Sequence, residues 1–155
     1  MQIRTREQLI SELNCYIDNG YLDINSFDNP LDEAAIALNE LYFIDSDACE
    51  NFCKKIMLSR DIGDSYLDSL CLLHLFDLNK EFSLRYVEEN IDNMPAPILG
   101  AAMDGLSQYS NTTFRQNFPN DLITKILHRY HDVTKDPFFK NMLESSYTFF
   151  TKGFL

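Results

Sequence analysis

The residues with the clearest capacity for chemistry are the cysteines. Cys49 and Cys53 stand four residues apart, which places both thiols on one helix face and makes half of a zinc site conceivable. A closed zinc site needs a second close pair of ligands, whereas Cys15 and Cys71 each stand alone in the sequence. We therefore interpret all four thiols as small buried apolar groups, and we expect neither a metal nor a disulfide.

The histidines form no recognisable catalytic arrangement. His128 and His131 flank two residues in HRYHD and adjoin Asp132. This spacing could orient a metal or a general base, but no Cys or Ser nucleophile lies in a known motif, so a basic helix end is the simpler interpretation. His74, within LCLLHLF, is expected in the core or a groove with a backbone partner. Since 24 Asp and Glu make chance carboxylate pairs unavoidable, we predict no enzyme activity and no cofactor.

The elements that carry these residues are predicted to be helices. Apolar residues recur with a helical period, and no segment shows the strong alternation of a β-strand. The weak strand candidate GYLDINSF, residues 20–27, is interpreted as a loop. Residues 70–76 are apolar nearly all round, so their helix is expected at the centre of the fold. Capping signals predict helix starts at Thr5, Asn29-Pro30, Ser46 or Asp47, Asp64-Ser65, Asn79 and Asp136-Pro137.

Inner helix positions recur along the chain. Ala35, Leu38 and Leu41 are followed 32 residues later by Leu67, Leu70 and Leu73, and later again by Leu99, Ala102 and Leu106. The predicted pairs are 30–43 with 47–58, 64–77 with 79–91, and 96–109 with 120–132. Such spacing is typical of α-solenoids, although an antiparallel bundle with short loops gives a similar period. We predict an all-α fold in one domain over residues 1–155, with antiparallel helix pairs stacked as a short HEAT-like α-solenoid of about eight helices.

Composition and charge narrow the possible partners. No apolar run approaches the roughly 20 residues that cross a bilayer, and the start MQIRTREQLISEL lacks the features of a signal peptide. We therefore expect a cytoplasmic protein.

The net charge is −11, and from Glu7 to Cys53 there are eleven acidic residues and no Lys or Arg. Such a field repels phosphates and attracts basic proteins, so we expect no nucleic acid and no membrane among the partners.

The acidic stretch from Glu7 to Cys53, the central helix SLCLLHLF and the paired caps resemble some bacterial immunity proteins. These proteins accompany contact-dependent growth inhibition and related polymorphic toxins, and some are HEAT-like. The resemblance implies a protein that binds a cognate toxin domain, blocks its active site or its access to substrate, and does no chemistry of its own. A nuclease toxin would be basic, because it must hold phosphates. We expect a monomer that forms a 1:1 complex.

In this interpretation the second helix of each pair lines the binding side. The predicted contact residues are Tyr42, as an aromatic anchor, and the acids Asp45, Asp47, Glu50, Glu81, Glu88 and Glu89. The alternative function is a helical adaptor whose groove accepts a peptide or a helix, with the Phe-rich end as an apolar patch. In that segment we expect Tyr147 and Phe150 in the core, and Phe149 and Phe154 off the buried stripe.

Overall fold

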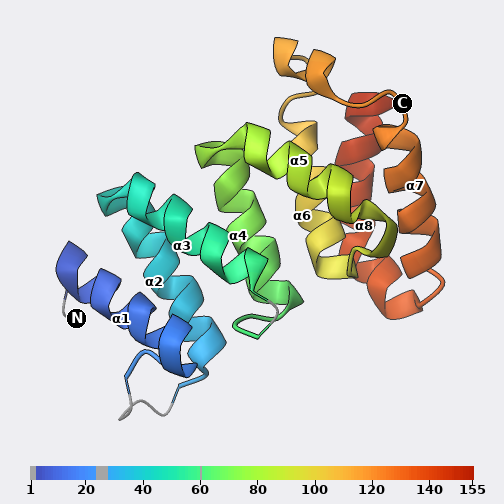
Figure 1. Ribbon diagram of the computed structural model, residues 1–155. Helices are drawn as coiled ribbons and strands as arrows, with labels where there is room; N and C mark the ends of the chain where they lie inside the picture. Colours follow the sequence, from blue (N-terminus) through green and yellow to red (C-terminus); the bar gives the residue numbers. More distant parts are fainter. Residues whose placement is uncertain (1–2, 24–27, 60) are drawn as a thin grey trace.

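The computed structural model in Figure 1 describes residues 3–23, 28–59 and 61–155. Over these residues the chain forms eight α-helices and two short 3-10 helices, with no strand. The predicted all-α fold of packed helix pairs is confirmed. The elements are α1 (Arg6–Asn19), α2 (Pro30–Ile44), α3 (Ser46–Leu58), α4 (Ser65–Leu78), α5 (Lys80–Asn90), η1 (Ile91–Asn93), α6 (Ala96–Ser107), η2 (Thr113–Asn117), α7 (Leu122–Val133) and α8 (Pro137–Phe154).

Most helix boundaries form where the capping residues predict them. Thr5 and Gln8 make a reciprocal capping box at the start of α1, and Gly20 ends that helix with a φ of 83°, in the left-handed region that favours glycine. Four further helices begin at predicted caps: Asn29, Asp64, Asn79 and Asp136. Of the loop expected over residues 20–27, residues 21–23 form no helix or strand, and residues 24–27 lie outside the described part of the chain.

The cap of α3 corrects the sequence analysis. Asp45 caps this helix, rather than Ser46 or Asp47, and its carboxylate accepts a hydrogen bond from the backbone N–H of Ala48 at 3.0 Å. The reason is the short connection between α2 and α3, in which Asp45 has extended backbone angles and Ser46 is already helical. A residue that was predicted to contact a partner therefore has a structural role.

The helices form two layers (Figure 1). Helices α2, α4, α6 and α8 lie side by side in what we call the first layer, and α1, α3, α5 and α7 pack against them as the second layer. The third predicted pair is the loosest, because α6 packs chiefly against α4 and α8 and less against α7. Among the described helices, none combines the length and apolarity that a bilayer crossing requires.

Helices α4 and α6 form the centre of the core, as the apolar run of α4 predicted. Leu72, Leu75 and Phe76 of α4 are fully buried. The small residues of α6 let the two backbones approach closely: a methyl group added at Gly105 would overlap the ring of Phe76. Within the first layer, α4 packs between α2 and α6, which lie on either side of it.

Candidate protein-binding site

The predicted contact residues form two groups, which lie near opposite ends of α5. Tyr42, Asp45, Asp47, Glu50 and Glu81 lie near the end where α2 finishes and where α3 and α5 begin. The side-chain amide of Asn79, at the start of α5, donates to Glu50 at 3.2 Å and so ties α5 to α3.

The other two acids, Glu88 and Glu89, lie near the opposite end of α5. The helical rise places Glu88 about 10 Å along the axis from Glu81. The structure therefore gathers five of the predicted residues at one end and separates the remaining pair.

Two of the gathered acids are engaged within the molecule. Asp45 forms an ion pair with Arg6, with 2.6 Å between the carboxylate and Nε, in addition to capping α3. Hydrogen bonds from the Ala48 backbone and from Arg6 lower the pKa of Asp45. Glu50 pairs with Lys54 at 2.6 Å, which lowers the pKa of Glu50. In contrast, Asp47, Glu81, Glu88 and Glu89 are exposed.

Tyr42 joins α2 to α4. Its hydroxyl donates a hydrogen bond to the Asp77 carboxylate, which raises the pKa of Tyr42, and its ring stacks on His74 with 5.1 Å between centroids. His74 Nε2 lies 2.8 Å from the side-chain oxygen of Asn39, so the partner of this histidine is a side chain and not the predicted backbone group. Burial lowers the pKa of His74. The aromatic side chain that projects into solvent here is Phe43, which is 84% exposed and which the sequence analysis missed.

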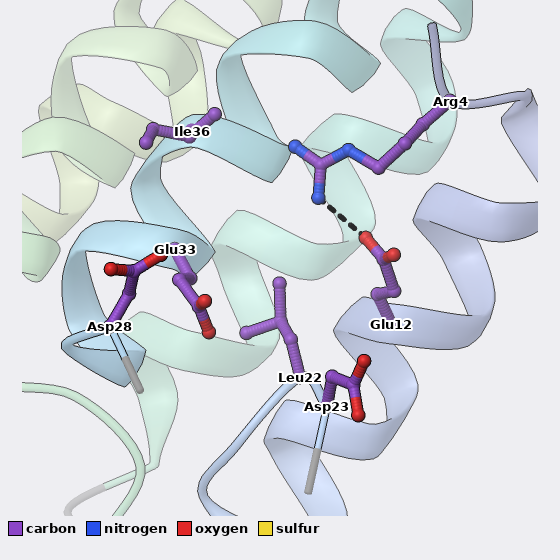
Figure 2. Close-up of a pocket in the computed structure, with 7 residues that line it drawn as sticks. All are labelled: Arg4, Glu12, Leu22, Asp23, Asp28, Glu33 and Ile36. Carbon is purple, nitrogen blue, oxygen red and sulfur yellow. Dashed lines mark hydrogen bonds and ion pairs between the residues drawn. The ribbon is translucent and has the colours of Figure 1, made fainter. Parts of the chain in front are cut away.

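A hollow of about 430 Å³ lies between α1 and α2 (Figure 2). Arg4 spans its rim and pairs with Glu12 at 2.6 Å and with Glu40 of α2 at 3.0 Å. None of the predicted contact residues lines this hollow, although its acids belong to the acidic stretch that the sequence analysis identified. The lining residues are Arg4, Glu12, Leu22, Asp23, Asp28, Glu33 and Ile36.

The thiols form a buried cluster that the sequence did not reveal. Cys53 on α3 contacts both Cys49 on the same helix and Cys71 on α4, and the hydrogen bond with Cys53, followed by burial, raises the pKa of Cys49. For Cys53 the bond with Cys49 lowers the pKa, but the bond with Cys71 and burial outweigh it. Within the described ranges, no group of three or more His, Cys, Asp or Glu side chains is arranged to hold a metal ion.

The remaining candidates lie at the C-terminal end. His128 and His131 are exposed on α7, with His131 in its last turn. The ring of Tyr147 stacks on Tyr130 at 3.8 Å and joins α8 to α7. This half-buried Tyr147 and the buried Phe150 confirm their predicted core positions.

The two Phe residues that were expected off the buried stripe differ from each other. Phe149 is 48% exposed, as expected. Phe154 is instead half-buried against Phe118 and Phe150, with the guanidinium of Arg115 over its ring at 4.9 Å. A long α8 brings Phe154 back over η2 and the loop beside it, which the period within α8 alone does not predict.

The acids at the starts of α3 and α5, the exposed Phe43 and the hollow between α1 and α2 are separate features of an acidic part of the molecule. Such a region can attract and hold a positively charged, partly apolar protein surface. In comparisons with known proteins, no protein-family model matches the chain, and a search of curated proteins finds no match.

Proposed function

We propose that this protein is an immunity protein that binds a basic toxin domain and blocks its active site or its access to substrate. The observation that carries the proposal is the uncompensated charge of α1, α2 and α3. Even with Arg4, Arg6, Lys54 and Lys55 included, residues 3–58 have a net charge of −7. The ion pairs of Arg4, Arg6 and Lys54 with acids of this region leave that excess in place.

This charge supports a basic partner for a physical reason. A surface of one sign speeds encounter with an oppositely charged protein by about 10- to 1,000-fold at low salt. A toxin that cleaves nucleic acid presents Lys and Arg to phosphates, and carboxylates compete for the same groups. Fast capture has value against a toxin that acts as soon as it enters a cell.

The test takes the proteins encoded by the neighbouring genes and purifies any toxin domain among them, which is then assayed for its own activity. We expect inhibition that is complete at a 1:1 ratio, and an association rate that falls markedly when salt rises from about 50 to 500 mM. Absence of inhibition, or an association rate that salt does not change, contradicts the proposal.

A helical adaptor is the second candidate function. The observation that favours it is the hollowed outer surface of the first layer around Tyr66, which is typical of a surface that accepts a helix. Tight binding to the toxin domain without any loss of toxin activity would favour this second candidate over the first.

A further inference from the structure

Three hollows on the first layer meet at one side chain, Tyr66. The first, of about 280 Å³, lies between α2 and α4; the second, of about 320 Å³, lies between α4, α6 and α8. The third, of about 600 Å³, continues toward the end of α7 and the start of α8. Tyr66 lines all three hollows and is 56% exposed. The three hollows therefore adjoin one another around Tyr66, and we call them together the Tyr66 surface.

The middle of the Tyr66 surface is apolar and lies below the side chains around it. Leu73, Pro97 and Met142 line the hollow between α4, α6 and α8. Gly100 brings α6 close to α8, since a Cβ at that position would lie 3.0 Å from a methyl group of Leu143. Small residues on α6 between larger ones on α4 and α8 leave a depression that a ridge of apolar side chains can fill.

The two smaller hollows are lined by acids and by no Lys or Arg, whereas the third is lined by Arg129 and Lys135 beside Asp132 and Asp136. Helices α2, α4 and α6, all of whose residues are described, contain no Lys or Arg, whereas α3, α5 and α7 of the second layer contain all six of the basic residues in these six helices. Asp32 and Asp64 line the hollow between α2 and α4, and Asp104 lines the next one. Asp104 is half-buried, and burial raises its pKa despite a hydrogen bond with Ser146. A cation brought beside this partly desolvated carboxylate would be favoured.

The shape of the Tyr66 surface and the secondary structure of the chain restrict which element of a partner protein can bind there. No strand edge is available over the described ranges, so a partner cannot add a strand to a sheet. An α-helix about 10 Å wide presents apolar residues every three to four positions and charged residues beside them. A second copy of this chain carries the same charge of −11 and is repelled.

We infer that the Tyr66 surface docks one amphipathic α-helix of a protein partner, with apolar side chains against Tyr66, Leu73 and Met142 and with Lys or Arg beside Asp32 and Asp104. The inference rests on the proposed binding of a basic partner and adds the surface and the element that are recognised. It places the contact on the first helices of the pairs, whereas the sequence analysis placed most of it on the second helices.

The direct test uses a fluorescein-labelled 18-residue peptide of Leu and Lys whose Leu residues share one helix face, with binding measured by fluorescence anisotropy at about 50 mM salt. Two further peptides separate shape from charge: one has the same composition in scrambled order, and one has Glu in place of Lys. We expect the Leu/Lys helix to bind at least tenfold more tightly than the scrambled peptide, and the Leu/Glu helix not to bind.

Matched variants locate the peptide. Tyr66→Ala and Asp104→Asn are expected to weaken binding about 5- to 30-fold each. Their controls in the second layer, Leu58→Ala and Asp18→Asn, remove an apolar side chain that is 67% exposed and an exposed acid of α1, and they are expected to leave the affinity unchanged. Thermal melts of all four variants verify that each is folded.

Several outcomes would overturn the inference. Equal affinity for the scrambled peptide would show that charge alone attracts it, and loss of binding in the control variants alone would place the contact on the second layer. No binding of the Leu/Lys helix would also refute the inference. The same variants in the toxin assay separate the two proposals: if Tyr66→Ala and Asp104→Asn inhibit the toxin domain like the unaltered protein, the docking surface is wrong and the proposed function stands.

Discussion

Asp68 provides the sharpest test of the structure, because its Oδ1 is shielded from solvent and has no hydrogen-bond partner among the described residues. It lies in the first turn of α4, four residues after the Asp64 cap. The loop before α4 passes close to it, since a Cβ at Gly63 would lie 3.2 Å from Oδ1. Burial, and then the negative charge of Asp64, raise the pKa of Asp68 to about 7. The negative charge of Asp68 contributes, after burial, to the raised pKa values of Tyr16 and Tyr86.

The direction of the pH effect follows from this raised pKa. The folded protein retains a proton on Asp68 up to about pH 7, whereas the unfolded chain releases it near pH 3.8. Because the folded state binds more protons in that window, the contribution of Asp68 to stability is fully present below about pH 4 and is lost as the pH rises to about 7. Above pH 7 the loss is constant, because both states are then ionised.

We therefore expect Asp68→Asn to stabilise the protein at pH 8. A tenfold change in proton affinity corresponds to about 1.4 kcal/mol, and the partial contact of Asp68 with solvent reduces the net effect. The expected gain in the free energy of unfolding is about 1–3 kcal/mol at pH 8, falling toward zero near pH 4. Urea titrations followed by circular dichroism at pH 4, 5, 6, 7 and 8 measure the difference between the variant and the unaltered protein.

Asp61→Asn is the matched control, because Asp61 lies in the loop before α4 and is exposed. This control removes the same formal charge and is expected to change stability little at any pH in the series. If Asp68→Asn gives a difference that does not vary with pH, or no gain at pH 8, then Asp68 is ionised and solvated in the folded protein and the reasoning is refuted.

Four further predictions address packing, capping, thiol burial and steering. Gly105→Ala is expected to lower the free energy of unfolding by about 1–3 kcal/mol in urea titrations, since the added methyl overlaps the Phe76 ring; an unchanged value contradicts the close approach of α4 and α6. Asn79→Ala removes the acceptor for the Phe82 N–H at the start of α5 and is expected to cost about 1 kcal/mol by calorimetry. A thiol reagent is expected to label half-buried Cys15 in the folded protein and the buried Cys49, Cys53 and Cys71 only in denaturing urea, as mass spectrometry can show; rapid labelling of Cys53 would count against its burial. Reversing Glu88 and Glu89 to Lys is expected to slow association with a basic toxin domain in stopped-flow measurements at low salt while the melting temperature stays the same, because both side chains are exposed.

Local signals in the sequence determined the helices and most of their ends. A cap such as Asn29 or Asp64 bonds to a backbone N–H two or three residues away, so the decisive partners are adjacent in sequence. The period of apolar residues likewise selected the buried face of each helix, and the apolar run of α4 determined its central place. The acidity of the first third of the chain is a property of composition and needed no fold.

The tertiary structure alone decided which faces meet. Asp45 pairs with Arg6 across 39 residues, Tyr42 reaches Asp77 across 35, and Cys53 meets Cys71 across the interface of α3 and α4. Helical period tells which side of a helix is buried but not which neighbour covers it. For the same reason, the neighbouring position of α2, α4 and α6, which contain no Lys or Arg, and the meeting of three hollows at Tyr66 emerge only when the helices are stacked, because each depends on residues that separate helices bring to one surface.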